Sequence, residues 1–408
     1  PINLYFYFSD EATEGVPSLR DYANRVREML EEFVSESGGR LRLSVIDPLP
    51  FSEEEDRATQ FGLQGAPIGL TGDSVYLGLA GTNSIGDEEI IAFFDPSKEA
   101  FLEYDLASLV STLANPQKSV VGLVSGVSLS GRFDPQAQRM VPAWVVYQQA
   151  EQLFEIRDLG TTFDAVPGDV SLLWIVQPKN LSNATQYAID QFVMQGGKAL
   201  IFVDPLAAID AMQVEGMPQG MPPMGQGSDL PLLFEGWGIE FTAQEVVADA
   251  QLALTINTGR GQPTRHYGYL GITPELMSGD DIVTGELGMI NTAMPGKIAL
   301  ADDSAATLEP MLTSSPVSSL LAASRFSFLP DPSALQQGFT SGGAPLTIAA
   351  RVSGILPSAF PNGRPATGVS ADDVQAEEDA GDAEHLTESR EPVNLIIVGD
   401  VDMLSDPL

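Results

Sequence analysis

The sequence contains no cysteine and only two histidines, so most side chains used in nucleophilic and metal chemistry are missing. The lack of cysteine excludes thiol nucleophiles, disulfides, thiolate metal sites and thiol redox pairs. The two histidines, His266 and His385, lie far apart in glycine-rich or acidic surroundings. A histidine metal site or a Ser-His-Asp triad therefore has few candidates, and we expect both histidines to be ordinary loop residues.

Basic residues are also scarce, because 20 Lys and Arg stand against 56 Asp and Glu, for a formal net charge of −36. A negatively charged surface repels the phosphates of nucleic acids and of anionic lipids. The few lysines are scattered along the chain and form no polybasic segment. The composition thus disfavours nucleic acid as a partner, and we interpret the acidity as a source of solubility.

Long apolar runs are absent as well. No run reaches the roughly 18 residues that a membrane span needs, and no signal peptide opens the sequence. The chain nevertheless begins within a strand pattern and stops just after another, so we expect membrane helices to flank it in the full-length protein. Its 408 residues, 43% of them hydrophobic, suffice for two or three globular domains.

Residues 1–117 predict a domain in which strands and helices alternate. Strand patterns occur at 2–8, 40–46, 75–80 and 89–94, and helix patterns at 17–34, 53–61 and 99–113. The order β-α-β-α-β-β-α is that of a thioredoxin-like domain. The loop after its first strand holds no Cys-x-x-Cys pair, which excludes thiol redox activity. Pro67 lies where such folds often carry a cis-proline, and the sequence leaves its isomer open.

Residues 118–408 predict a second α/β domain, built on a parallel sheet. Strands are predicted at 119–124, 154–159, 170–176, 198–203 and 394–398, and helices at 141–154 and 183–194. Strands that alternate with helices imply right-handed crossovers between parallel neighbours. The last strand returns to this sheet after a long mixed α+β insertion at about 206–360. Within the insertion we expect strands at 235–247, 251–256, 296–301 and 347–352.

Two segments predict irregular surface loops. Residues 212–227 repeat Met, Pro and Gly, which suits a flexible loop or lid. A soft methionine surface that binds a partner is the alternative for this loop. Residues 362–392 are acidic and nearly free of large apolar side chains, a composition typical of disorder.

Four segments together carry a family resemblance: Val45-Ile-Asp-Pro48, residues 169–181, residues 188–205 and residues 395–404. In this order they resemble the GldG-like (gliding-motility) family of ABC-type transport auxiliary proteins, over nearly the whole chain. The resemblance implies that the second domain is similar to class I glutamine amidotransferases, which are flavodoxin-like, without their chemistry. Many relatives carry a histidine in the glycine-rich turn where this chain has Ser125-Gly-Val-Ser128, so no residue roles are carried over there.

The same resemblance implies a function. It predicts a noncatalytic auxiliary component of a gliding-motility or export-type transporter, which works beside an ABC permease and ATPase. It further implies a periplasmic, extracytoplasmic location, anchorage by flanking transmembrane helices, and no cofactor. A homo-oligomer and a hetero-oligomer both stay open.

Open parallel sheets bind ligands at the carboxyl ends of their strands. The candidate ligand-binding residues there are Ser125, Gly126, Ser128, Gln177, Lys179, Asp204, Asp400 and Asp402. Neither serine lies in a Gly-x-Ser-x-Gly elbow. The three aspartates could hold Mg²⁺ or Ca²⁺, but short acids at strand ends more often cap the next helix or turn. We predict no catalytic residue and no metal site; the alternative is a metal-assisted or Ser-dependent hydrolase on an amidotransferase-like scaffold.

Overall fold

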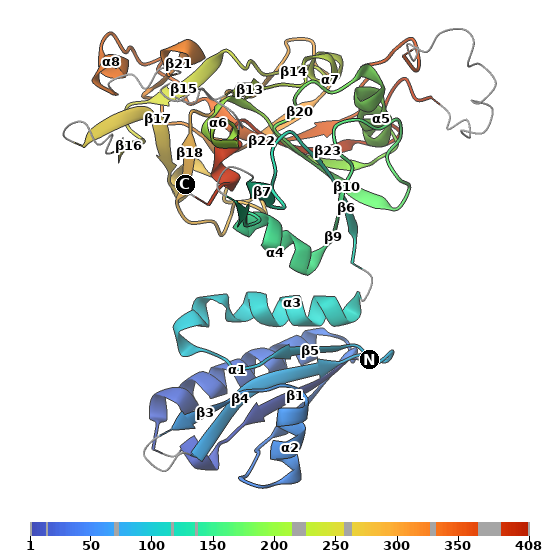
Figure 1. Ribbon diagram of the computed structural model, residues 1–408, viewed down its shortest axis with the longest axis vertical. Helices are drawn as coiled ribbons and strands as arrows, with labels where there is room; N and C mark the ends of the chain where they lie inside the picture. Colours follow the sequence, from blue (N-terminus) through green and yellow to red (C-terminus); the bar gives the residue numbers. More distant parts are fainter. Residues whose placement is uncertain are drawn as a thin grey trace. The chain divides into compact units, whose positions relative to one another are not determined.

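The computed structural model describes residues 2–13, 15–68, 73–115, 118–134, 138–213, 226–256, 263–326, 332–365 and 385–406. The chain divides into two compact units, Pro1–Lys118 and Ser119–Leu408. Figure 1 shows the elements of each unit. Within the described ranges, none of the helices combines the length and apolar character of a membrane-spanning segment.

The first unit is a five-stranded sheet in the order β2-β1-β4-β3, with β5 also paired to β4. The strands are β1 (Ile2–Phe8), β2 (Leu41–Ile46), β3 (Gly65–Ile68), β4 (Asp73–Thr82) and β5 (Glu88–Ile91). β1 and β2 run parallel because α1 (Pro17–Glu36) connects them as a crossover. The other neighbours are antiparallel.

Helices cover both faces of this sheet (Figure 1). On one face α1 and α3 (Leu102–Ala114) bury Leu4, Val26 and Leu106 in one cluster. On the other face α2 (Glu53–Gln60) packs Ala58 against Tyr7. α2 begins at a capping residue, since the side chain of Ser52 accepts a hydrogen bond from the Glu55 N–H.

The sequence did not predict β3, because it contains Pro67, which has no N–H for a strand ladder. β3 lies at the edge of the sheet, where the missing N–H costs no pairing. Among the described residues every peptide bond is trans, that of Pro67 included. The predicted strand 89–94 ends at Ile91, and the start of the predicted helix 99–113 is a 3₁₀ helix, Pro96–Phe101. The thioredoxin-like assignment stays a prediction.

The second unit is built on a seven-stranded sheet in the order β20-β22-β23-β11-β10-β6-β9. Its strands are β6 (Val120–Ser125), β9 (Glu155–Asp158), β10 (Val170–Val176), β11 (Lys198–Phe202), β20 (Thr307–Thr313), β22 (Thr347–Gly354) and β23 (Val393–Val398). The five strands from β9 to β23 run parallel, and β22 and β20 add an antiparallel edge. The sequence predicted the parallel strands but did not place residues 307–313 and 347–354 in this sheet.

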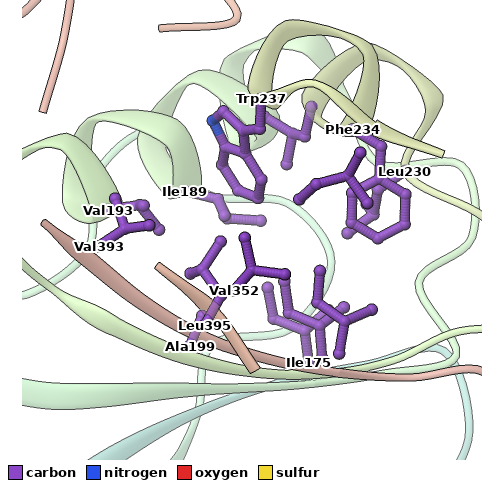
Figure 2. Close-up of a cluster of buried hydrophobic side chains, with 14 of the residues drawn as sticks. Ile175, Ile189, Val193, Ala199, Leu230, Phe234, Trp237, Val352, Val393 and Leu395 are labelled. Carbon is purple, nitrogen blue, oxygen red and sulfur yellow. The ribbon is translucent and has the colours of Figure 1, made fainter. Parts of the chain in front are cut away.

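Both faces of the large sheet are buried, which explains the continuous apolar runs of its strands. α5 (Asn183–Met194) and α7 (Pro231–Trp237) cover one face, where Ile189 and Trp237 pack toward Ile175 and Leu395 (Figure 2). The other face buries Tyr147 of α4 (Val145–Leu153). The predicted helix 141–154 begins only at Val145, because residues 139–141 pair in the short hairpin of β7 (Arg132–Asp134) and β8 (Arg139–Val141).

The insertion forms small ribbons beside this sheet. They are β12 (Asp204–Ala207) with β13 (Gln226–Ser228), β14 (Ile239–Glu240) with β19 (Ala299–Leu300), β15 (Glu245–Asp249) with β21 (Ser318–Ala322), and β16 (Ala253–Ile256) with β17 (Thr264–Ile272) and β18 (Ile290–Ala293). The insertion also contains α7 and two further short helices, α6 (Ala208–Gln213) and α8 (Pro332–Gln336). The single strand predicted at 235–247 is wrong: α7 ends at Trp237, and Gly238, with φ 68°, turns the chain into β14.

The two predicted loops lie largely outside the described residues, since 214–225 and 366–384 are not among them. The described end of the acidic loop contradicts the prediction of disorder. Ser389 is buried and exchanges hydrogen bonds with the backbone of Leu356, and the Arg390 N–H donates to the Met194 carbonyl. These bonds hold Ser389 and Arg390 against the chain after β22 and the end of α5. The acidic composition of the neighbouring residues gave no sign of this order.

Candidate functional site

The carboxyl ends of β6, β10, β11 and β23 meet at one edge of the large sheet, and the predicted site residues follow them. The ribbon β12–β13 lies against this edge. Gln177, fully buried after β10, donates from Nε2 to the Gln226 carbonyl at 2.9 Å. Its Oε1 accepts a hydrogen bond from Ser228 Oγ at 2.7 Å. The Gln177 amide is thus used to fasten β13 onto the sheet.

Three predicted residues, Asp204, Asp400 and Asp402, lie buried at the same edge. Asp204 accepts from the Leu206 N–H at 2.7 Å and from the Val401 N–H at 2.8 Å. It therefore ties the chain after β11 to the chain after β23.

The other two aspartates make the same kind of bond. Asp400 accepts from the N–H groups of Ala293 at 2.6 Å and Met403 at 2.9 Å. Asp402 accepts from Ala208 at 2.7 Å and Ile209 at 2.8 Å, the first two residues of α6. Each oxygen of the three carboxylates thus receives one backbone N–H. The expectation that short acids here act as caps is confirmed, although Asp402 caps a helix about 190 residues away in sequence.

Burial changes the acid–base properties of these three carboxyl groups. It raises the pKa of Asp204 and Asp400 well above the usual range, and the neighbouring Asp402 raises both further. The pKa of Asp402 rises to about 6, chiefly because of burial, against the lowering effect of the Ile209 and Ala208 N–H groups. Asp402 therefore changes its protonation in mildly acidic conditions.

Within the described ranges, no group of three or more His, Asp or Glu side chains is arranged to hold a metal ion. The oxygens of the three aspartates are instead occupied by backbone N–H groups.

The remaining candidates also bond within the protein. Lys179 Nζ contacts both carboxylate oxygens of Asp210 on α6, at 2.7 and 2.8 Å. Ser125 Oγ donates to the Val127 carbonyl at 2.7 Å. The Lys179–Asp210 ion pair holds α6 to the loop after β10, and the Ser125 hydrogen bond stabilises the turn after β6.

Ser128 and Gly126 belong to the same turn. Ser128 Oγ donates to the Gly131 carbonyl at 3.0 Å. A Cβ at Gly126 would lie 2.2 Å from the Gln177 carbonyl oxygen, so glycine is required for the close approach of the two loops. All eight predicted residues therefore lie at one edge of the large sheet, and each makes contacts within the protein that stabilise the fold.

Neither histidine lies in the loops that directly follow β6, β10, β11 and β23. His266 lies on β17 and not in a loop, so that expectation is wrong; its ring packs edge-on against Tyr269 at 4.8 Å. Burial lowers the pKa of His266 to about 4, so the imidazole is neutral at neutral pH. His385 lies in a loop as expected, stacked on Tyr187, whose hydroxyl is 3.2 Å from Nδ1.

Hollows occur elsewhere in both units. One of about 810 Å³ lies between α7, β14 and β19 in the insertion; its charged lining residues are Asp229, Glu235, Glu240, Glu245, Asp303 and Lys297. One of about 630 Å³ lies between α1 and α3 in the first unit; its charged lining residues are Glu32, Glu36, Glu103 and Arg40. Sequence reasoning missed both, because their linings join only when distant segments pair.

The fold defines an α/β protein of two units, with a mixed sheet whose carboxyl edge is sealed by its own insertion. A family model described as "ABC-type uncharacterized transport system" (ABC_transp_aux) matches residues 118–408, so the chain belongs to this family of auxiliary transport components. The resemblance drawn from the sequence is thereby confirmed. A second family model, described as a domain of unknown function (DUF7088), matches residues 1–82.

Other comparisons add little. No curated protein matches the chain. Among solved structures, it is similar to the cold-adapted β-galactosidase from Rahnella sp. R3, at 13% identity over 64% of this chain. The match spans 39% of the β-galactosidase chain, and its TM-score of 0.22 carries no argument.

Proposed function

We propose that this chain is a noncatalytic auxiliary component that acts outside the cytoplasm beside the permease and ATPase of an ABC transporter. Membership of the auxiliary transport family supports the transporter role. The lack of cysteine and the net charge of −36 are compatible with an extracytoplasmic surface. Anchorage by flanking helices and a gliding-motility or export-type system belong to the same proposal.

One observation carries the noncatalytic part of the proposal. The polar groups at the carboxyl edge of the sheet, where an α/β enzyme places its chemistry, bond to the protein's own backbone and side chains. A general base needs a free lone pair directed at substrate, and a nucleophile needs such a base. This edge therefore works as a structural joint, and the hydrolase alternative gains no support from it.

We also propose that the first unit is thioredoxin-like and the second amidotransferase-like. The parallel β1–β2 pair with helices on both faces supports the first assignment. The five parallel strands with crossover helices support the second.

The noncatalytic proposal can be tested in cells that lack the native gene. The Ser125→Ala/Ser128→Ala double variant removes the two hydroxyls that a Ser-dependent hydrolase at this edge would use. We expect full-length protein with these changes to restore transport to within about twofold of the unchanged protein. Loss of transport, with the variant present at normal level and folded by circular dichroism, would support the hydrolase.

A further inference from the structure

An exposed apolar loop projects from the insertion between the 3₁₀ helix Pro274–Leu276 and β18. Within residues 278–289, Ile282 is 94% exposed and Met289 63% exposed, and Val283 and Leu287 are also exposed. Four large apolar side chains within eight residues expose surface that water solvates poorly, and such a patch commonly marks an interaction site.

This loop is anchored to the large sheet. Arg351 of β22 makes a two-pronged ion pair with Asp281, from Nε to Oδ2 at 2.9 Å and from Nη2 to Oδ1 at 3.1 Å. Arg351 holds the pKa of Asp281 below its usual range, so the pair stays charged at neutral pH. Bidentate Arg–carboxylate pairs fix geometry as well as adding energy, so the base of the loop has a defined position.

The loop also closes on itself. The buried Thr284 donates from Oγ1 to the Ser278 carbonyl at 2.7 Å, and the N–H groups of Thr284 and Gly285 donate to the Asp281 carbonyl. A Cβ at Gly285 would lie 2.8 Å from the Gly279 carbonyl oxygen, so the turn is tightly packed. A loop that is ordered before binding loses little conformational entropy when a partner covers it.

Charge restricts what can cover the loop. Residues 267–296 contain four acidic side chains, Glu275, Asp280, Asp281 and Glu286, and no Lys, Arg or His. An anionic lipid surface would be repelled. A second copy of this chain is also disfavoured, because acidic side chains outnumber basic ones in both hollows described above, by five to one and by three to one. The complement is a protein surface with an apolar socket and a Lys- or Arg-rich rim.

We propose that loop 278–289 is a preformed docking element, and that its partner is a transporter subunit with an apolar socket rimmed by basic side chains. This inference rests on the proposed role beside an ABC transporter. Ile282 and Met289 provide the apolar anchors, and Asp280 and Glu286 provide charges that steer the approach.

The test measures how much permease is recovered with tagged full-length protein from its native membrane. The variant Ile282→Asp/Met289→Asp places charge on the two anchors, and both positions are exposed, so the fold is kept. The matched control is Phe133→Asp/Met140→Asp on the hairpin β7–β8, whose side chains are also exposed. We expect the loop variant to lower permease recovery by about tenfold or more, and the control to stay within about twofold.

A photo-crosslinking amino acid at position 282 gives a second readout that needs no loss of binding. Crosslinks to the permease or to another subunit of the same transporter support the proposal. If the unchanged protein recovers the permease and the loop variant recovers it equally well, the docking element is wrong while the proposed function stands. Crosslinks only to lipid or to a second copy also overturn the docking element. If the unchanged protein recovers no transporter subunit, the proposed function fails and the inference falls with it.

Discussion

At the scale of single residues, the three buried aspartates show how a short acidic side chain can organise a fold. Asp204, Asp400 and Asp402 connect the ends of two strands, β18 and the start of α6 through backbone N–H groups. The sequence placed these residues at the right edge of the sheet, because strand ends can be read from apolar runs. It could not show that N–H groups from about 100 to 200 residues away would satisfy them.

The raised pKa of Asp402 predicts that the stability of the protein depends on pH. Its pKa is about 6 in the folded protein, against about 3.9 in an unfolded chain. Between these values Asp402 binds more protons in the folded state, so its contribution to the free energy of unfolding falls as pH rises from about 4 to about 6. We expect Asp402→Asn to reduce this slope, measured by urea unfolding at several pH values.

Other buried groups contribute in the same range: the raised pKa values of Asp204 and Asp400 add to the fall, whereas the pKa of His266, lowered to about 4, makes stability rise with pH. The difference between Asp402→Asn and the unchanged protein isolates the Asp402 contribution, because the other groups are present in both. Asp281 and Asp169 have pKa values lowered by Arg351 and Arg157, so they act below this pH window and with the opposite sign. Parallel stability curves for Asp402→Asn and the unchanged protein between pH 4 and 6 would contradict the assignment.

The close approach of Gly126 to Gln177 predicts that a side chain at position 126 destabilises the protein. The alanine Cβ of Gly126→Ala would meet the Gln177 carbonyl oxygen, a backbone atom that cannot rotate away. We expect a loss of about 1–3 kcal/mol in the free energy of unfolding, measured by urea denaturation. Gly168→Ala is the control, because its Cβ meets nothing within 4 Å. Equal stabilities for the two variants would show that the turn adjusts freely.

At the scale of elements, the sequence predicted best where one pattern determines one element. The helix at 183–194 and the strand at 170–176 have the predicted bounds, because a cap, a helical period and a buried run each act locally. β12, β13 and β18 were not predicted, because their pairing depends on distant partners. The sequence located the candidate site because the ends of apolar strands can be read locally. It did not show that the insertion covers this edge of the sheet, because that contact joins distant segments.

The cap of α5 gives a prediction at this scale. Ser182 Oγ accepts the Thr185 N–H at 3.1 Å, so Ser182→Ala leaves a helix-terminal donor without its partner. We expect a loss of about 1 kcal/mol from the second unit, seen as a lower urea midpoint. Ser52→Ala, at the cap of α2, should lower the stability of the first unit instead. A Ser182→Ala change that leaves the second unit's midpoint unaltered would argue against the cap.

At the scale of the whole molecule, the chain has separate hydrophobic cores in its two compact units. The clusters around Leu4 and Tyr7 belong to Pro1–Lys118, and those around Ile175 and Tyr147 belong to Ser119–Leu408. We therefore expect residues 118–408 expressed alone to fold cooperatively, measured by circular dichroism and thermal unfolding. A molten, protease-sensitive product would contradict this separation.

We propose that this chain is a binding partner of an ABC transporter, and the decisive measurement is whether the transporter is recovered with it. Full-length tagged protein would be purified from its native membrane in mild detergent, with a tagged unrelated membrane protein as control. The account predicts that one permease and one ATPase of the same transporter are recovered in stoichiometric amounts with the tagged protein and not with the control. Repeated recovery of neither subunit, from membranes in which both are present, would contradict it.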